Sequence, residues 1–235
     1  MKTLLFDYGG TLDTAAKHWY YVFEEAYQKV GLHIPDNELR QAYVFGERYL
    51  AKNPMITPND DFATLLKKKI RQQFNWLEEA QLLSGDKASH EKLIEEITTY
   101  CDDFARAHTQ QSAQVLQTLK DKGYTLIIVS NFYGNLKSVL AAYNLLHFFT
   151  DIVESAVVGV RKPDAAIWQL GVKVANSSAQ NCIAIGDSFS KDIVPAHASG
   201  IETIWFKGKE WEDKEYDESL PSHIITSLTD ILQIL

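Results

Sequence analysis

The chain has 235 residues, of which 46% are apolar and 23% charged, the balance of a globular protein rather than a disordered or fibrous one. Its 31 acidic and 23 basic residues give a formal net charge of −8, which argues against nucleic acid or an anionic membrane surface as the main partner. Two cysteines are too few for a disulfide framework, and no apolar segment reaches the roughly 18 residues of a membrane span. We therefore expect a cytoplasmic protein, a monomer or weak dimer, with a small soluble substrate.

The first predicted element is a strand at residues 3–8, and the chain beyond it shows only helical periodicity as far as residue 100. Apolar stripes at helical spacing occupy residues 19–30, 65–77 and 93–100. The basic run Lys67, Lys68 and Lys69 is predicted to form a solvated helix face. These patterns predict an all-helical domain at residues 15–100, inserted after the first strand.

Helices and strands alternate in the rest of the chain. Helical patterns are found at residues 111–122, 136–143, 163–175 and 192–199, and strand patterns at 125–130, 151–154, 182–186, 203–206 and 223–225. Gly123 is placed to end the first of these helices, and Pro163 suits a first helical turn. The alternation predicts an α/β fold, a Rossmann-like parallel-sheet core formed by residues 1–14 and 101–235.

Residues able to do chemistry follow the predicted strands at the sheet edge where open α/β folds bind ligands. In chain order they are Asp7, Gly9, Gly10, Thr11, Ser130, Asn131, Lys162, Asp187 and Asp192. Three carboxylates at one edge repel each other unless a cation compensates, and oxygen ligands suit a hard cation. The sequence therefore predicts a Mg²⁺ site beside an ammonium group that can hold an anion.

Four segments resemble the motifs of the haloacid dehalogenase-like hydrolase superfamily and occur in the same order. They are FDYGGTLD, IVSN, GVRKPD and IGDSFSKD. The third and fourth are specific in combination, because a Lys–Pro pair rarely stands about 25 residues before such an acidic motif by chance. The resemblance covers the α/β core and implies that the helical insert is a cap over the site.

The resemblance implies a role for each matching residue. Asp7 matches the nucleophile that becomes an aspartyl phosphate, while Ser130 and Lys162 match the groups that hold the transferring phosphoryl oxygens. Asp187 and Asp192 match acidic residues at the metal, to which Asp7 and the Gly9 main-chain carbonyl also contribute. Residues beside these, Asn131, Thr11 and Gly10, are expected to contact substrate. The implied activity is a Mg²⁺-dependent phosphatase acting on a small phosphorylated metabolite.

One position departs from the family pattern. Phosphatases of the superfamily carry a second Asp two residues after the nucleophile, as the general acid and base, and here this residue is Gly9. Such assistance is worth about 10²- to 10⁴-fold in rate, so substrates with poor leaving groups would suffer most. Three residues of the same loop are candidates to replace it, namely Tyr8, Asp13 and His18. Otherwise the protein turns over only good leaving groups, or binds a phosphorylated ligand with little turnover.

Two other reactions of the superfamily stay open as alternatives. Dehalogenases place a Tyr where Gly9 stands and need no metal, whereas here Tyr8 comes one residue too early and Asp187 keeps the metal pattern. Phosphonatases carry a small residue at this position and use a cap lysine as a Schiff-base former. Lys29 and Lys52 are among the candidates for that lysine, and the sequence singles out neither.

Overall fold

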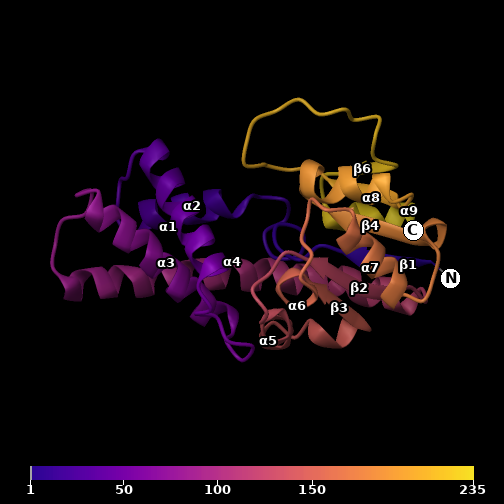
Figure 1. Cartoon of the computed structure of the whole chain (residues 1–235), viewed down its shortest axis with the longest axis horizontal. Helices are drawn as coiled ribbons and strands as arrows, with labels where there is room; N and C mark the ends of the chain where they lie inside the picture. The colour runs from indigo at the N-terminus through magenta and orange to yellow at the C-terminus, as the bar shows by residue number, and fades with distance from the viewer. Residues whose placement is uncertain (1) are drawn as a thin grey trace.

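The computed structural model describes residues 2–235, and its centre is a six-stranded sheet in which all neighbouring strands are parallel (Figure 1). The strands are β1 (Thr3–Phe6), β2 (Thr125–Ser130), β3 (Asp151–Glu154), β4 (Cys182–Gly186), β5 (Glu202–Phe206) and β6 (His223–Ile225). Their spatial order is β3-β2-β1-β4-β5-β6. The predicted parallel α/β sheet is confirmed, and β1 ends two residues earlier than expected.

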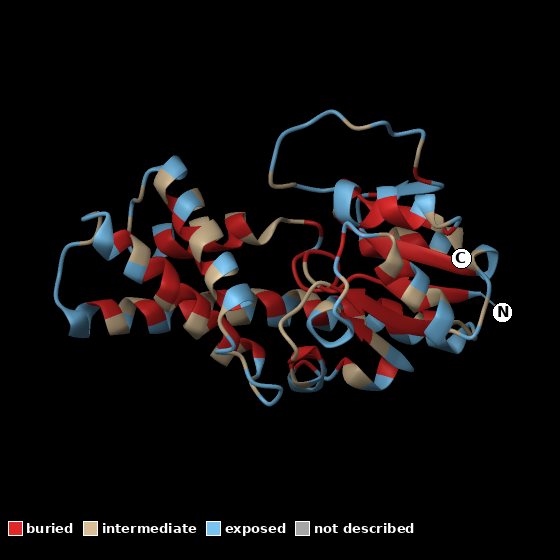
Figure 2. Ribbon diagram, viewed as in Figure 1, coloured by how far each residue is buried: buried red, intermediate tan, exposed pale blue. Residues whose placement is uncertain are grey.

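Helices cover both faces of this sheet. One face packs against α4 (Lys87–Asp121), α5 (Leu136–Ala142) and α9 (Ile231–Ile234), and the other against α7 (Ala166–Val174) and α8 (Val194–Ala198). A hydrophobic core lies on each face of the sheet. Alternate residues of β1 point to opposite faces, so that Leu4 and Phe6 pack in one core and Leu5 packs in the other. The strands are therefore buried on both sides (Figure 2), which explains their nearly continuous apolar sequences.

Two predicted helix starts differ from the structure. Pro163 lies in a turn rather than in a first helical turn, and α7 begins at Ala166, where the Asp164 carboxylate accepts the main-chain N–H at 2.9 Å. The helix predicted to begin at residue 192 is α8, which begins at Val194. A wide helical turn, Phe189–Ile193, precedes it and includes the first two predicted residues. A short helix, α6 (Ser155–Val158), follows β3.

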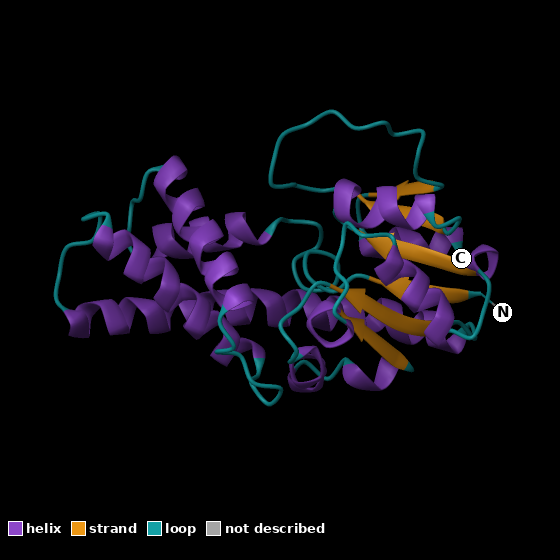
Figure 3. Ribbon diagram, in the orientation of Figure 1, coloured by secondary structure: helices purple, strands orange, loops and turns teal. Residues whose placement is uncertain are grey.

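The interval between β1 and β2 is helical, as predicted (Figure 3). It contains α1 (Trp19–Lys29), α2 (Asp36–Lys52), α3 (Phe62–Glu79) and α4. We call α1, α2, α3 and the first half of α4 the helical insert. Helix α4 continues without a break beneath the sheet and ends just before Gly123, whose φ of +91° is typical of a helix C-cap. The domain limit expected at residues 100/101 falls inside this helix and stays a prediction.

A long loop between β5 and β6, residues 207–222, touches the insert. The indole of Trp211 stacks on Tyr43 of α2, with ring centroids 5.5 Å apart, and its carbonyl accepts a hydrogen bond from Arg40 at 3.1 Å. The N–H of His18 donates to the Lys209 carbonyl at 2.8 Å. This loop thus joins the start of α1 and helix α2 to the core. Within residues 2–235, no helix is long and apolar enough to cross a membrane.

Candidate active site

Asp7 lies directly after β1, at the centre of the sheet, and two side chains meet its carboxylate, one from the end of β2 and one from the turn before α7. The Ser130 hydroxyl, at the end of β2, donates to Asp7 Oδ1 at 3.0 Å, and Lys162 Nζ donates to the same oxygen at 2.5 Å. All three residues are buried. The carboxyl ends of β1 and β2 stand side by side, so residues more than 120 positions apart in sequence converge. The three predicted catalytic residues are therefore adjacent in space.

The Lys162 ammonium also holds Asp192, whose Oδ1 lies 2.7 Å from Nζ. Burial by itself would lower the pKa of Lys162, but the charges of Asp192 and Asp7 outweigh it and hold this pKa above its usual value. The ammonium therefore stays charged between two carboxylates. A group in this position can also neutralise charge on an anion that approaches Asp7.

Asp187 and Asp192 follow β4 and are themselves held in place. The Thr11 hydroxyl donates to Asp187 Oδ1 at 3.0 Å, and the Ser188 N–H donates to Asp192 Oδ2 at 3.0 Å. Burial raises the pKa of Asp187 well above its usual range, and the neighbouring charges of Asp192 and Asp7 raise it further. Burial likewise raises the pKa of Asp192, to about 6, although Lys162 opposes the change. Both shifts record crowded negative charge in a site shielded from water.

These carboxylates fit a divalent cation. Asp7, Asp187 and Asp192 each offer an oxygen, and the three oxygens lie within 4.8 Å of one another. The backbone gives them room, because a Cβ at Gly10 would lie 2.3 Å from Asp187 Oδ2 and one at Gly186 would lie 2.4 Å from Asp192 Oδ2. One ammonium among three buried carboxylates leaves excess negative charge, which a hard cation with oxygen ligands would offset.

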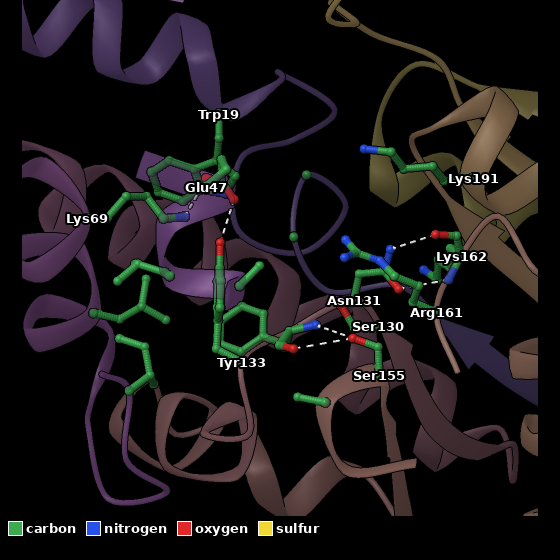
Figure 4. Close-up of a pocket in the computed structure, with 18 of the residues that line it drawn as sticks. Trp19, Glu47, Lys69, Ser130, Asn131, Tyr133, Ser155, Arg161, Lys162 and Lys191 are labelled. Carbon is green, nitrogen blue, oxygen red and sulfur yellow. Dashed lines mark hydrogen bonds and ion pairs between the residues drawn. The ribbon is translucent and has the colours of Figure 1, made fainter. Parts of the chain in front are cut away.

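A cavity of about 690 Å³ opens above Asp7 and is walled by both the core and the helical insert (Figure 4). Of the nine predicted site residues, all but Thr11 line it. Asn131 fixes the backbone of Lys162, accepting its N–H at 2.9 Å and donating to its carbonyl at 3.0 Å. The expected substrate contacts of Asn131, Gly10 and Thr11 stay predictions.

The wall contributed by the insert contains an ion pair that the sequence did not reveal. Lys69 of α3 pairs with Glu47 of α2 at 2.6 Å, and Tyr133, from the loop after β2, donates its hydroxyl to the same carboxylate (Figure 4). Lys69 is only 8% exposed, so the prediction that it belongs to a solvated face was wrong. It shares a helix face with Leu65, Leu66 and Ile70, and this register is the signal that separates it from its neighbours. Lys67 and Lys68 are less buried and pair with Glu95 and Asp60.

The three candidates for the missing acid lie in different places. Tyr8 and Asp13 are completely buried and do not line the cavity, and Asp13 accepts hydrogen bonds from Gly10 N at 2.6 Å and Trp19 Nε1 at 3.0 Å. His18 does line the cavity. Its Nδ1 accepts the Tyr20 N–H at 3.2 Å, so a neutral ring carries its proton on Nε2. Burial lowers the pKa of His18 to about 4, which makes it a neutral donor at pH 7.

The two named lysines of the insert also differ. Lys52 lines the cavity from the end of α2, and Lys29 is not among the lining residues. The cation most deeply buried in this wall is Lys69, whose ion pair with Glu47 keeps the ammonium beside a carboxylate.

Curated relatives match about half of the chain. It is 34% identical over 127 residues to the glyceraldehyde 3-phosphate phosphatase of Pyrococcus furiosus, covering 52% of each chain. It is 29% identical over 139 residues to haloacid dehalogenase-like hydrolase domain-containing protein 3 of Mus musculus, covering 57% of this chain and 55% of that one. The pyrimidine 5'-nucleotidase PynA of Streptococcus pneumoniae is 28% identical over 123 residues, covering 52% and 51%. The chain spans about half the length of these relatives.

Solved structures match over the whole chain. A dehalogenase superposes with a TM-score of 0.68 at 16% identity, covering 100% of this chain and 97% of that one. A HAD phosphatase from Thermococcus onnurineus gives a TM-score of 0.54 at 21% identity, with the same coverage. At this identity the likeness establishes the fold. The family model for haloacid dehalogenase-like hydrolases matches residues 1–200, which include the four motif segments and the cluster around Asp7. The chain belongs to the haloacid dehalogenase-like hydrolase family.

Proposed function

We propose that this hydrolase is a Mg²⁺-dependent phosphatase that acts on a small phosphate ester through an aspartyl phosphate on Asp7. The observation that carries the proposal is the Lys162 ammonium, held between Asp7 at 2.5 Å and Asp192 at 2.7 Å beside the three clustered carboxylates. Curated relatives whose names include phosphatase and nucleotidase support phosphate esters as the substrate class.

In the first step one carboxylate oxygen of Asp7 attacks phosphorus, and the bond between phosphorus and the leaving-group oxygen breaks. Lys162 and Ser130 already touch Asp7 Oδ1, so both are placed to hold the phosphoryl oxygens as charge moves onto them. In the second step water attacks the phosphorus of the acyl phosphate, which releases inorganic phosphate and restores the Asp7 carboxylate. Both steps are confined to the cavity beneath the insert.

We propose Asp7, Asp187 and Asp192 as the carboxylate ligands of Mg²⁺, supported by the closeness of their oxygens, and the Gly9 carbonyl as a main-chain ligand. The bound ion would neutralise the crowded carboxylates and draw electron density from the phosphoryl oxygens. Thr11 and Ser188 keep two of these carboxylates in position. We propose the insert, with limits at residues 15–100, as the cap that excludes water and selects the substrate.

The substrates are proposed to be those with good leaving groups. No side-chain acid is available at Gly9, and of Tyr8, Asp13 and His18 only the last lines the cavity. A neutral imidazole with its proton on Nε2 can donate a hydrogen bond to a departing oxygen, but its pKa of about 4 leaves almost no imidazolium at pH 7. Acyl and aryl phosphates need least protonation, so they should react fastest.

The test compares p-nitrophenyl phosphate and acetyl phosphate, with Mg²⁺ and with EDTA, in the wild type and in Asp7→Asn. We expect hydrolysis that needs both the metal and Asp7. Activity that persists without both would contradict the proposal.

A second candidate function is favoured by Gly9 itself. Without the acid, the protein could bind a phosphorylated ligand and turn it over hardly at all. Retained binding of vanadate, a phosphate analogue, together with no turnover of either ester would favour this alternative. The dehalogenase alternative has less support, because the carboxylates after β4 suit a metal. Two lysines of the insert line the cavity, and Lys69 is ion-paired, which leaves Lys52 as the Schiff-base candidate.

A further inference from the structure

The cavity is rich in positive charge although the chain as a whole is acidic. The cationic side chains that line it are Arg48, Lys52, Lys69, Arg161, Lys162 and Lys191, and the carboxylates are Asp7, Glu47, Asp187 and Asp192. Six cations against four carboxylates give the lining a formal charge of +2, whereas the chain has a net charge of −8. The positive charge is therefore concentrated where the substrate would bind.

Only two of these cations are matched by carboxylates. Lys162 pairs with Asp7 and Asp192, and Lys69 pairs with Glu47. Throughout residues 2–235, Arg48, Lys52, Arg161 and Lys191 form no ion pair. Four cations around one cavity are thus left for a ligand.

A single phosphate group does not neutralise the positive charge of the cavity lining. A divalent cation among the three carboxylates would raise the formal charge of the lining from +2 to +4. A phosphate dianion would then leave an excess of two positive charges. A substrate with one more anionic group would match the cavity better than a phosphate ester of a neutral alcohol.

Two of the cationic residues that form no ion pair are the sequence neighbours of residues at the proposed phosphoryl site. Arg161 is the chain neighbour of Lys162, and Lys191 is the neighbour of Asp192, so each Cα lies about 3.8 Å from that of a residue at the phosphoryl site. Both side chains extend into the cavity (Figure 4). Lys191 and His18 line the same cavity, and the charge of Lys191 is the second cause, after burial, of the low pKa of His18.

Resting on the proposed function, we propose that the substrate carries a second anionic group, bound by Arg161 and Lys191 from the core. Arg48 and Lys52, at the C-terminal end of α2, line the same cavity from the insert. A second phosphate and a carboxylate both satisfy this chemistry. The substrate class is therefore a small phosphate ester with another anionic substituent close to the ester.

The experiment compares three aryl phosphates with Mg²⁺ present: 3-carboxyphenyl phosphate, its methyl ester and 1,3-phenylene bisphosphate. The first two differ by one negative charge and have similar leaving groups. We expect kcat/KM for the carboxylate to exceed that for the methyl ester by about 3- to 30-fold, mainly through KM, because exposed ion pairs contribute modestly. The bisphosphate shows whether a second phosphate is preferred to a carboxylate.

The double variant Arg161→Gln/Lys191→Gln should bring the ratio between carboxylate and methyl ester close to one. The matched control is Lys173→Gln, which removes an exposed charge of α7 outside the cavity and should keep the ratio. Equal kcat/KM values for the two esters in the wild type, or a ratio that the double variant does not change, would overturn the inference.

Failure of the phosphatase proposal can be distinguished from failure of the proposal that the substrate carries a second anionic group. If neither ester is hydrolysed, the proposed function fails, and calorimetric binding of the two esters to Asp7→Asn still tests the second anionic group. Tighter binding of the carboxylate supports the inference, and equal binding contradicts it.

Discussion

The hydroxyl of Tyr133, in the loop after β2, donates a hydrogen bond to the Glu47 carboxylate of α2, so one contact joins the core to the helical insert at the wall of the cavity. Glu47 also pairs with Lys69, and burial, which by itself would raise its pKa, is outweighed by this ammonium, so that the pKa stays below its usual value. The carboxylate is therefore charged when Tyr133 donates to it. Hydrogen bonds to charged groups are the stronger class.

Removing this contact should loosen the insert. We expect Tyr133→Phe to lower the free energy of unfolding by about 1.5 to 3 kcal/mol, the usual contribution of a hydrogen bond to a charged group. Urea denaturation measures this change. Glu47→Gln and the double variant complete a mutant cycle, whose coupling energy should be of similar size. A coupling energy near zero would show that the hydroxyl and the carboxylate do not stabilise one another.

Restoring the acid at Gly9 should widen the substrate range. Gly9 lines the cavity, and a Cβ at this position would meet no heavy atom within 4 Å, so the backbone here can carry a side chain that starts in open space. We expect Gly9→Asp to raise kcat/KM for an alkyl phosphate by up to about 10²-fold, and for acetyl phosphate much less.

Gly9→Asn is the matched control, because it has nearly the same shape and no acidic proton. It should leave the difference between alkyl and acyl substrates unchanged. If Gly9→Asp slows both substrates, the absent acid is not what limits alkyl phosphates.

Asp13 should make stability depend on pH. Burial raises its pKa from 3.8 to about 7, opposed in part by hydrogen bonds from Gly10 and Trp19. Between these two values the folded state keeps a proton that the unfolded state has released. The free energy of unfolding should therefore fall as pH rises from about 4 to 7, by at most about 1.4 kcal/mol per pH unit for this group.

Asp13→Asn tests the assignment, because an amide does not ionise. The amide has one acceptor oxygen for two donors, so the variant should be less stable than the wild type at roughly pH 5. The difference in free energy of unfolding between the wild type and the variant should become smaller as pH approaches 7, since only the wild type loses stability through ionisation of Asp13. Urea unfolding in EDTA at several pH values measures both slopes, and parallel slopes would refute the role of Asp13.

Metal binding should stabilise the folded protein. The three carboxylates come together only in the folded chain, so Mg²⁺ at 100 times its dissociation constant should add about 2.7 kcal/mol to the free energy of unfolding. Asp187→Asn should abolish this gain. In EDTA the same variant should be more stable than the wild type at neutral pH, because it removes a carboxyl group whose ionisation in the folded chain is disfavoured by burial and by the charges of Asp192 and Asp7.

Thermal unfolding with and without Mg²⁺ measures both effects. Asp103→Asn, at an exposed acid on α4, is the control and should respond to Mg²⁺ as the wild type does. A full metal shift in Asp187→Asn would remove this residue from the metal site.

The sequence determined the sheet and the family because both are written in local patterns. Buried parallel strands are short apolar runs, and their carboxyl ends must share one edge, so Asp7, Ser130 and Asp187 could be placed together before any contact was known. The residue at which α7 begins could not be predicted from the sequence. Whether Pro163 enters the helix depends on the turn in which the Asp164 carboxylate accepts the Ala166 N–H.

Only the tertiary structure decided which side chains surround the substrate. Lys69 stands in a basic run, and its burial depends on how α3 packs against α2. Tyr133 and Glu47 are 86 residues apart, and Trp211 contacts Tyr43 from the loop between β5 and β6. No periodicity relates such residues, because the direction in which the insert folds back over the core is set by contacts between distant segments. Composition and spacing identify the reacting groups, whereas the packing of the insert determines which other side chains line the cavity around them.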